Sequence, residues 1–204
     1  MADSPSNPAR RRFLTGAATA VGAVGVGFAA VPFLSSFQPS AKAEAAGAPV
    51  DVNIAKLSPG QMTTVSWRGK PVYVVHRTDR MLEFLPELND EVQDPDSRVV
   101  DQQPPFAANI YRAREESKRY LVVVGICTHL GCAPTYRPEV APDDLGDDWK
   151  GGFFCPCHGS KFDISGRVYK GVPAPTNLEV PPYVYVSSDI GDIIRVGGTE
   201  EEAA

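Results

Sequence analysis

Two short stretches contain all four cysteines and two of the three histidines of this 204-residue chain. They are residues 127–132, with the sequence CTHLGC, and residues 155–160, with the sequence CPCHGS. Thiolates and imidazoles are the ligands that soft and borderline transition metals prefer. We therefore expect the fold to bring these two loops together at one site. This requirement constrains the fold more than any other feature of the sequence.

Three kinds of site compete for these residues. A structural zinc site uses the same ligands, but it usually spaces them as Cys-x2-4-Cys and His-x3-5-His, which differs from the pattern here. Two disulfides would leave both histidines without a role. A 2Fe–2S cluster held by two cysteines and two histidines uses one Cys and one His from each loop, and it leaves one cysteine over in each loop. The third arrangement gives both histidines a role and fits the spacing of both loops, so it is favoured over the other two.

The chain resembles the Rieske iron–sulfur subunit of a bacterial ubiquinol–cytochrome c reductase, the cytochrome bc complex. The resemblance covers nearly the whole chain and is most specific in CTHLGC and CPCHGS. The sequence GVPAP at 171–175 and the arginines that precede an N-terminal apolar run carry it more weakly.

This resemblance implies one 2Fe–2S cluster of the Rieske type. Its ligands would be Cys127 and Cys155 on one iron, and His129 and His158 on the other. It also implies a disulfide between Cys132 and Cys157. A soluble Rieske ferredoxin would have no use for this last pair.

The resemblance further implies that this chain transfers electrons in the respiratory chain, as a subunit of a complex that is both an oxidoreductase and a translocase. The cluster would accept one electron from quinol, and His129 or His158 would contact the quinol and take its proton. Leu130, Pro173 and Pro175 would form an apolar docking collar. Domain movement would then bring the electron to a c-type cytochrome. The implied partners are a cytochrome b subunit, a c-type cytochrome subunit and quinol, within a dimeric complex.

Ser160 and Phe162, which follow the ligands of the second loop, affect the redox potential of the cluster. Ser160 lies where the family's serine donates a hydrogen bond to a cluster sulfur, which raises the potential. High-potential members carry a tyrosine two residues later, and this chain has Phe162 there. We therefore expect a lower potential than in relatives that have the tyrosine.

The N-terminus predicts export and membrane anchoring. Arg10, Arg11 and Arg12 precede Phe-Leu, which is typical of a twin-arginine signal, and residues 13–37 carry no charge. As a helix, these 25 residues would extend about 37 Å, enough to cross a hydrocarbon core of about 30 Å. The arginines would stay in the cytoplasm, so the C-terminal domain would lie in the periplasm beside the inner membrane. A removed signal peptide, ending near Ala41-Lys42-Ala43, is the alternative.

The expected organisation is a cytoplasmic terminus over 1–12, an anchor over 13–37, a hinge linker over 38–49 and a domain over 50–204. Nineteen prolines and eighteen glycines indicate many turns, so we expect a mostly β, antiparallel domain with a cluster-binding subdomain over about 121–180. Periodicity predicts strands over 50–54, 62–67, 72–76, 120–126, 151–154, 161–163, 167–169, 178–180, 183–187 and 193–196.

The remaining segments predict one helix and two surface excursions. Residues 80–88 have an apolar helical face, with Asp79 as the expected cap. Residues 89–119 and the chain between the two loops are polar and proline-containing, so both are expected at the surface. The net charge of −5 and the absence of a basic patch argue against nucleic-acid binding.

Two other functions fit parts of the sequence. The first is the small Rieske subunit of a periplasmic oxidoreductase such as arsenite oxidase, but the long anchor, the linker and the GVPAP sequence count against it. The second is a binding module in which a metal only stabilises the fold, and its protein would show no iron–sulfur absorbance.

Overall fold

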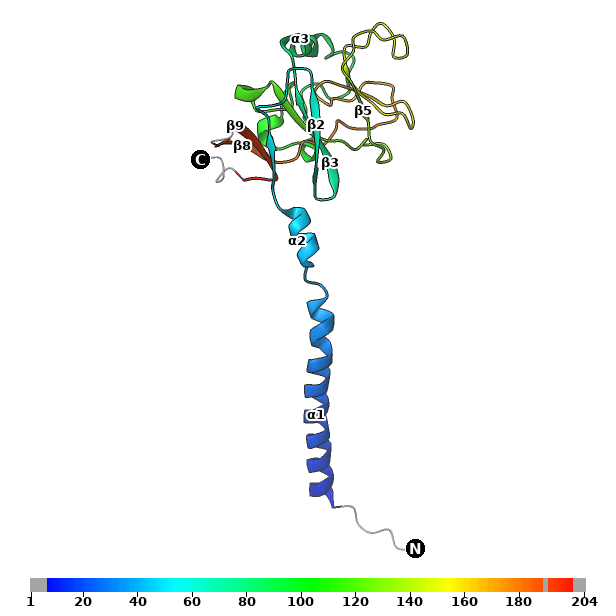
Figure 1. Cartoon of the computed structure of the whole chain (residues 1–204). Helices are drawn as coiled ribbons and strands as arrows, with labels where there is room; N and C mark the ends of the chain where they lie inside the picture. The colour runs from blue at the N-terminus through cyan, green and yellow to red at the C-terminus, as the bar shows by residue number, and fades with distance from the viewer. Residues whose placement is uncertain (1–6, 189–190, 200–204) are drawn as a thin grey trace. The chain divides into compact units, whose positions relative to one another are not determined.

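The structure is a computed structural model that describes residues 7–188 and 191–199. It divides into two compact units, residues 1–45 and 46–204. The first contains helix α1 (Pro8–Ser35), which begins where the Asn7 side chain accepts hydrogen bonds from the amides of Ala9 and Arg10 (Figure 1). By length and composition α1 can cross a membrane. A short helix, α2 (Ala41–Gly47), follows in the alanine-rich linker, where the alanines favour helix.

Among the described residues, the second unit contains three antiparallel sheets of three strands each, which confirms the predicted mostly β domain. The strands are β1 (Val50–Asn53), β9 (Gly191–Val196) and β8 (Tyr183–Ser188) in the first sheet, β2 (Met62–Trp67), β3 (Lys70–His76) and β4 (Tyr120–Val124) in the second, and β5 (Thr135–Arg137), β6 (Gly152–Phe154) and β7 (Lys161–Asp163) in the third.

The sheet of β2, β3 and β4 forms the centre of the hydrophobic core. β3 pairs with a neighbour on each side, and Val72, Val74 and Val122 are fully buried there. The β2–β3 turn consists of Arg68 and Gly69, both in the left-handed region, as a two-residue hairpin requires. β4 leads from this core towards the first Cys/His loop.

Two predicted strands are absent from the described residues. Val168 and Tyr169 form only isolated bridges, with Phe162 and Val92 respectively. Residues 178–180 are held instead by separate bonds, such as the 2.8 Å bond from the Val124 amide to the carbonyl of Glu179. Both segments are extended and paired, but too briefly to form a ladder.

The helix predicted over 80–88 is α3 (Asp79–Glu87), and its predicted cap is wrong. The Thr78 hydroxyl accepts the hydrogen bond from the Met81 amide at 3.3 Å, so Thr78 is the N-cap. Asp79 is the first helical residue and forms an ion pair with Arg119 at 2.7 Å. Leu82 and Leu85 are buried on the core side of the helix.

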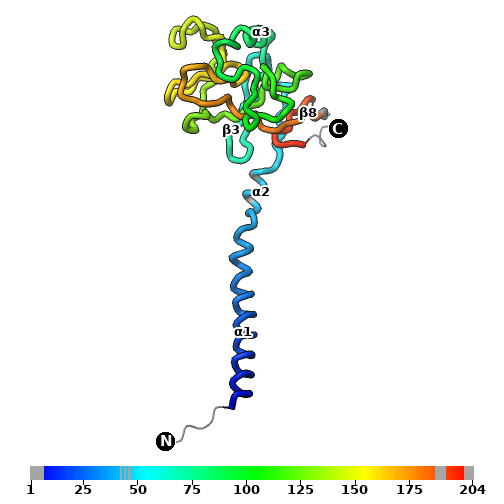
Figure 2. The backbone as a smooth tube through the Cα atoms, turned by 180° about the vertical axis from the view of Figure 1, so that it is seen from behind, coloured from blue at the N-terminus to red at the C-terminus, as the bar shows by residue number. Residues whose placement is uncertain are grey.

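The prediction that 89–119 is a surface excursion is only partly correct: many of its residues are exposed, but others, such as Val92 and Arg112, are buried. The segment contains three 3-10 turns, η1 (Val100–Gln102), η2 (Pro105–Ala107) and η3 (Glu115–Ser117), and it covers part of the core (green in Figure 2). Arg112 is fully buried and donates hydrogen bonds to Ser97 Oγ and Gln103 Oε1, at 2.9 and 2.8 Å. Part of the polar composition of segment 89–119 therefore serves a buried hydrogen-bond network.

The chain between the two Cys/His loops is only partly exposed. It contributes β5 to the third sheet, and Leu145 and Trp149 are buried within it. Trp149 donates from its indole nitrogen to the carbonyl of Arg137 at 3.2 Å and stacks on Tyr169. This segment therefore has a small apolar core of its own, which corrects the prediction of a surface excursion.

Candidate metal centre

The two Cys/His loops share one backbone pattern. In each, the amide of the first cysteine donates to the carbonyl five residues later, Cys127 to Cys132 and Cys155 to Ser160, both at 2.8 Å. One loop follows β4 and the other follows β6, so strands of two different sheets deliver them. The two loops are therefore closed by main-chain bonds alone.

A glycine four residues after the first cysteine completes each loop. Gly131 and Gly159 donate to the carbonyls of Cys127 and Cys155, at 3.0 and 2.9 Å. Their φ angles, 84° and 75°, lie in the left-handed region that favours glycine. These glycines let the chain turn back tightly enough to present several side chains from six residues.

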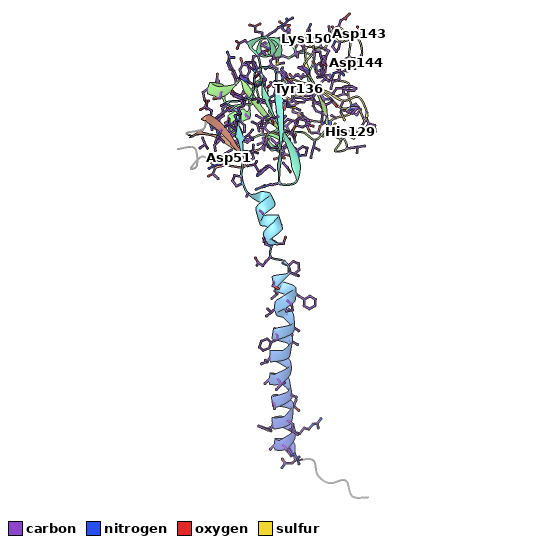
Figure 3. The ribbon with its side chains drawn as sticks, in the orientation of Figure 1. Asp51, His129, Tyr136, Asp143, Asp144 and Lys150 are labelled. Atoms are coloured by element: carbon purple, nitrogen blue, oxygen red, sulfur yellow. A yellow bond between two sulfur atoms is a disulfide. The ribbon has the colours of Figure 1, made fainter. Side chains whose placement is uncertain are left out.

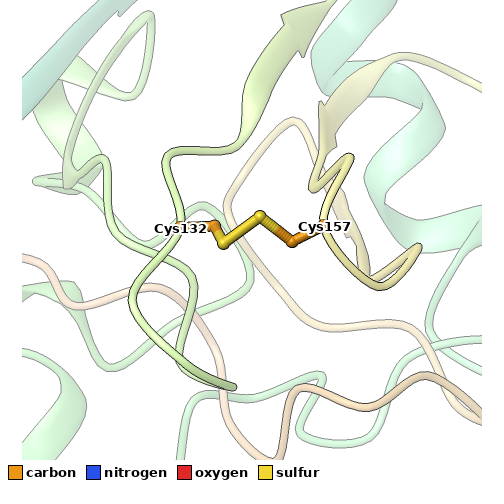
Figure 4. Close-up of a disulfide and its surroundings, with 2 residues drawn as sticks. All are labelled: Cys132 and Cys157. Atoms are coloured by element: carbon orange, nitrogen blue, oxygen red, sulfur yellow. A yellow bond between two sulfur atoms is a disulfide. The ribbon is translucent and has the colours of Figure 1, made fainter.

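A disulfide joins the loops, as the resemblance implied (Figure 4). Cys132 and Cys157 are bonded, with their Cα atoms 6.6 Å apart. Cys127 and Cys155 remain free thiols, each 2% exposed. The arrangement with two disulfides is therefore not formed.

The two free thiols lie together in the interior. Burial raises the pKa of the Cys127 thiol, because a thiolate is poorly solvated there, and the neighbouring Cys155 thiol raises it further. The Ser160 hydroxyl acts in the opposite direction, by hydrogen bonding to Cys127. Two thiolates in this place require the positive charge of a bound cation, which a metal supplies.

The two loop histidines lie on the outer side of the thiols. Their rings meet edge to face with centroids 4.8 Å apart, and His158 is exposed while His129 is half-buried. His129 Nδ1 is buried and has no hydrogen-bond partner within the part of the chain that the structure describes. Figure 3 shows His129 at the margin of the globular unit, on the opposite side from Asp51. An unpartnered buried imidazole nitrogen is a typical metal ligand.

These residues fit a metal centre with two sulfur and two nitrogen ligands. A second group of sulfur atoms, from Cys132, Cys155 and Cys157, lies within 4.8 Å of one another. Two of these three form the disulfide and cannot act as thiolates, so this group is not a ligand set. The fit rests on the free thiols and the two histidines.

The proline segment, residues 171–175, is hydrogen-bonded to the second loop, and Thr176, the residue after it, is hydrogen-bonded to the first. The Ala174 amide donates to Ser160 Oγ at 3.1 Å, and the Thr128 hydroxyl donates to the Thr176 carbonyl at 2.7 Å. Pro173 and Pro175 are exposed. Leu130 in the first loop is 71% exposed. Exposed apolar side chains therefore occur on the first loop and on the proline segment, which bonds to the second loop.

Tyr73 is a supporting residue that the sequence did not reveal. A Cβ added to Gly125, which precedes the first loop, would clash with the Tyr73 ring. The Tyr73 hydroxyl donates to the carbonyl of Pro134, which follows the loop, at 3.1 Å. Its ring also stacks on Phe153 of β6, with centroids 5.9 Å apart. Tyr73 thus contacts both ends of one loop and the strand that delivers the other. Gly125 inside an apolar run was the available signal, because such a glycine often marks a close approach to the backbone.

Comparisons with known proteins bear on the same regions. Residues 88–183 match a family model described as the Rieske 2Fe-2S domain. Residues 1–40 match a model described as the ubiquitinol-cytochrome C reductase Fe-S subunit TAT signal. The first match includes both loops and the proline segment, and the second includes the three arginines and the apolar run.

Two curated proteins called ubiquinol-cytochrome c reductase iron-sulfur subunit are similar over most of the chain. The protein from Allochromatium vinosum is 58% identical over 181 residues, which cover 89% of this chain and 86% of the relative. The protein from Blastochloris viridis is 45% identical over 198 residues, covering 97% and 98%. A solved structure titled "Hyperthermophilic respiratory Complex III" is 25% identical, covers 88% of this chain and 98% of its own, and gives a TM-score of 0.45.

Proposed function

This chain belongs to the family of ubiquinol–cytochrome c reductase iron–sulfur subunits, and on that basis we propose that it carries electrons from quinol to a c-type cytochrome in such a complex. The observation that supports this most directly is the pair of matching loops, which hold two thiols in the interior and two imidazoles on the outer side. When bound there, a Rieske 2Fe–2S cluster supplies a one-electron acceptor at the tip of the unit.

The proposed ligands are Cys127 and Cys155 on the inner iron, and His129 and His158 on the outer iron. Burial of the thiols keeps water and oxidants from the sulfur atoms. Exposure of His158 lets an imidazole nitrogen meet another molecule directly. The division into an inner and an outer pair therefore suits a centre that exchanges electrons through its histidine side.

The histidines also handle the proton of the quinol. An imidazole nitrogen of His129 or His158 that faces outward accepts a hydrogen bond from the quinol hydroxyl, and it then holds the proton. Leu130, Pro173 and Pro175 form the apolar collar, which contacts the quinol pocket and excludes water from this bond. Ser160 donates to the Cys127 sulfur and so favours the reduced state.

The first unit supplies the anchor. We place α1 across the bacterial inner membrane, with the three arginines in the cytoplasm and the domain over 50–204 in the periplasm. Residues 38–49, which include α2, then act as the hinge along which the domain moves. The partners are a cytochrome b subunit and a c-type cytochrome subunit in a dimeric complex.

A visible difference spectrum of the complex that co-purifies with this chain from detergent-solubilised membranes tests the proposal. We expect haem bands of both the b and the c type together with iron–sulfur absorbance. An iron–sulfur spectrum without b haem, accompanied by molybdenum, would instead place the chain in a periplasmic oxidoreductase. Absence of iron–sulfur absorbance in freshly isolated protein would contradict any electron-transfer role.

The Phe162→Tyr variant is expected to raise the midpoint potential of the cluster. Phe162 is fully buried on β7, in the same hydrophobic core as Cys127 and Cys155. The resemblance to high-potential members, which have a tyrosine at this position, implies that a hydroxyl here would donate to a ligand sulfur. One added hydrogen bond of about 1–1.5 kcal/mol corresponds to roughly 40–60 mV for a one-electron couple. A redox titration followed by EPR measures the shift.

The control for this variant is Phe154→Tyr. Phe154 lies on β6 next to Phe153, the cross-strand partner of Phe162, and alternation places its side chain on the other face of the sheet. We expect this control to leave the potential within about 10 mV of the parent chain, below the effect of one hydrogen bond. A Phe162→Tyr protein with a full EPR signal and an unshifted potential would show that the hydroxyl forms no such bond.

A further inference from the structure

A single glutamine side chain bridges two points of the proline segment's backbone. Gln93 Nε2 donates hydrogen bonds to the carbonyl of Tyr169, just before the segment, at 3.1 Å, and to the carbonyl of Ala174, within it, at 3.4 Å. One amide group thus connects the start of the segment to its middle. The family resemblance implies no role for Gln93. The residue lies in segment 89–119, which the sequence predicted to be at the surface.

Ala174 is held from both sides as a result. Its amide donates to Ser160 Oγ at 3.1 Å, and its carbonyl accepts from Gln93. Ala174 is fully buried, whereas Pro173 and Pro175 on either side of it are exposed. Fixing Ala174 on the inside keeps the two prolines on the outside, where the proposed collar lies.

The backbone of Gln93 is itself firmly placed. Its amide donates to the carbonyl of Val168 at 2.9 Å, and the next bond along this pairing runs from the Lys170 amide to the carbonyl of Glu91 at 2.8 Å. Val92 between them is buried and bridges Tyr169. The side chain of Gln93 is exposed, so replacing it removes its hydrogen bonds without creating a cavity in the core.

We propose that Gln93 is a positioning residue for quinol binding, because its amide group holds the proline segment in the form that the collar requires. This inference rests on the proposed function for its link to quinol, but the bracing of the segment does not depend on that function. This bracing distinguishes Gln93 from an ordinary surface glutamine, whose replacement would not change the conformation of the proline segment.

Three variants in the complete membrane complex separate the donor role from charge. Gln93→Met and Gln93→Glu remove the donor, whereas Gln93→Lys keeps a donor and changes the charge. Gln61→Met is the matched control, since the Gln61 side chain accepts from the Ser58 amide at 3.1 Å in a different part of the unit. A donor role predicts that Met and Glu behave alike and that Lys remains close to the parent chain.

Two readouts are needed. Hydrogen exchange of the peptide that contains Ala174 is expected to become about five-fold faster in the Met and Glu variants, which corresponds to a hydrogen bond of about 1 kcal/mol. The KM for quinol is expected to rise about five-fold while kcat stays within two-fold, because the collar acts in binding. The Lys variant and the Gln61→Met control should match the parent chain in both measurements.

The outcomes distinguish this inference from the proposed function. Unchanged hydrogen exchange in the Met and Glu variants overturns the bracing role, whatever the activity. Opposite shifts in the Glu and Lys variants overturn it in favour of a charge effect. Faster exchange with an unchanged KM overturns the link to quinol binding. If the Met and Glu variants exchange faster than the parent chain, but the parent complex itself does not oxidise quinol, the bracing role is supported and the proposed function is refuted.

Discussion

The Asp163→Asn variant is expected to lose about 3–5 kcal/mol of the free energy of unfolding of the globular unit, which is typical of a broken buried ion pair. Asp163 Oδ2 accepts from Arg167 Nε at 2.7 Å, and neither side chain is exposed. Asp163 Oδ1 also accepts from the amides of Ser165 and Arg167, at 2.8 and 2.9 Å. Asparagine can keep the bonds to Oδ1, but it would place an NH2 group against the guanidinium.

The surroundings of Asp163 explain why this loss is expected to exceed that of a surface ion pair. Asp163 is the one fully buried carboxylate among the described residues, and it lies among the buried arginines Arg77, Arg112 and Arg167. Burial lowers the pKa of Arg77 to about 10, and the carboxylate of Asp163 opposes this shift. Without Asp163, the buried guanidinium groups of Arg77 and Arg112 would lose an attractive charge, and that of Arg167 would lose its ion-pair partner. The carboxylate therefore stabilises more than its direct partner.

Chemical denaturation of the purified subunit in detergent, followed by tryptophan fluorescence, measures this effect. Trp149 and Trp67 are both buried and therefore report on unfolding. Asp143→Asn is the control, because Asp143 is exposed on the chain between the two loops (Figure 3), and we expect it to change the free energy of unfolding by less than about 0.5 kcal/mol. A loss below about 1 kcal/mol for Asp163→Asn would show that the ion pair contributes no more than a surface pair.

Replacing Cys132 and Cys157 together by serine is expected to remove most of the bound cluster. The disulfide closes a loop with a sequence separation of 25, for which chain entropy alone gives a stabilisation of about 3.5 kcal/mol. It also joins the two loops that carry all four proposed ligands. Without it the loops can separate, and water can then reach the thiols of Cys127 and Cys155.

Iron content and the EPR signal of the reduced cluster measure the outcome. We expect less than about a tenth of the parent chain's iron, because a loss of about 3.5 kcal/mol lowers the equilibrium constant for association of the two loops by more than a hundred-fold. Cys127→Ser, which removes a proposed ligand, serves as the reference for a chain without a cluster. Full iron content in the double serine variant would show that Tyr73 and the main-chain bonds suffice to hold the loops together.

The candidate site could be predicted from sequence because its chemistry is local. Each loop places a cysteine, a histidine and a glycine within six residues. This spacing can be read from the sequence and does not depend on how the rest of the chain folds. The strand over 62–67 was also predictable, because its burial pattern follows its alternation. The choice between Asp79 and Thr78 as the cap was not, because both are good caps and the backbone decides between them.

Other features depend on contacts that sequence patterns do not record. Arg112 and Gln103 are typical surface residues, but here each satisfies the other in the interior. Tyr73 looks like an ordinary strand residue, and only the fold brings its ring against Gly125. Polar residues are buried when partners from distant segments satisfy them, and those partners are unknown before the fold is known.

Closure of both Cys/His loops by main-chain bonds has a consequence for how such a site can change. The bonds from Cys127 and Cys155 to the ends of their loops use only amides and carbonyls, and the turns need only a glycine. The proposed ligand side chains at 129 and 158 can therefore be exchanged without removing any bond that closes the loops. A chain of this kind is a ready scaffold for protein design, in which cysteines at these two positions would convert a mixed-ligand site into an all-thiolate one of lower potential.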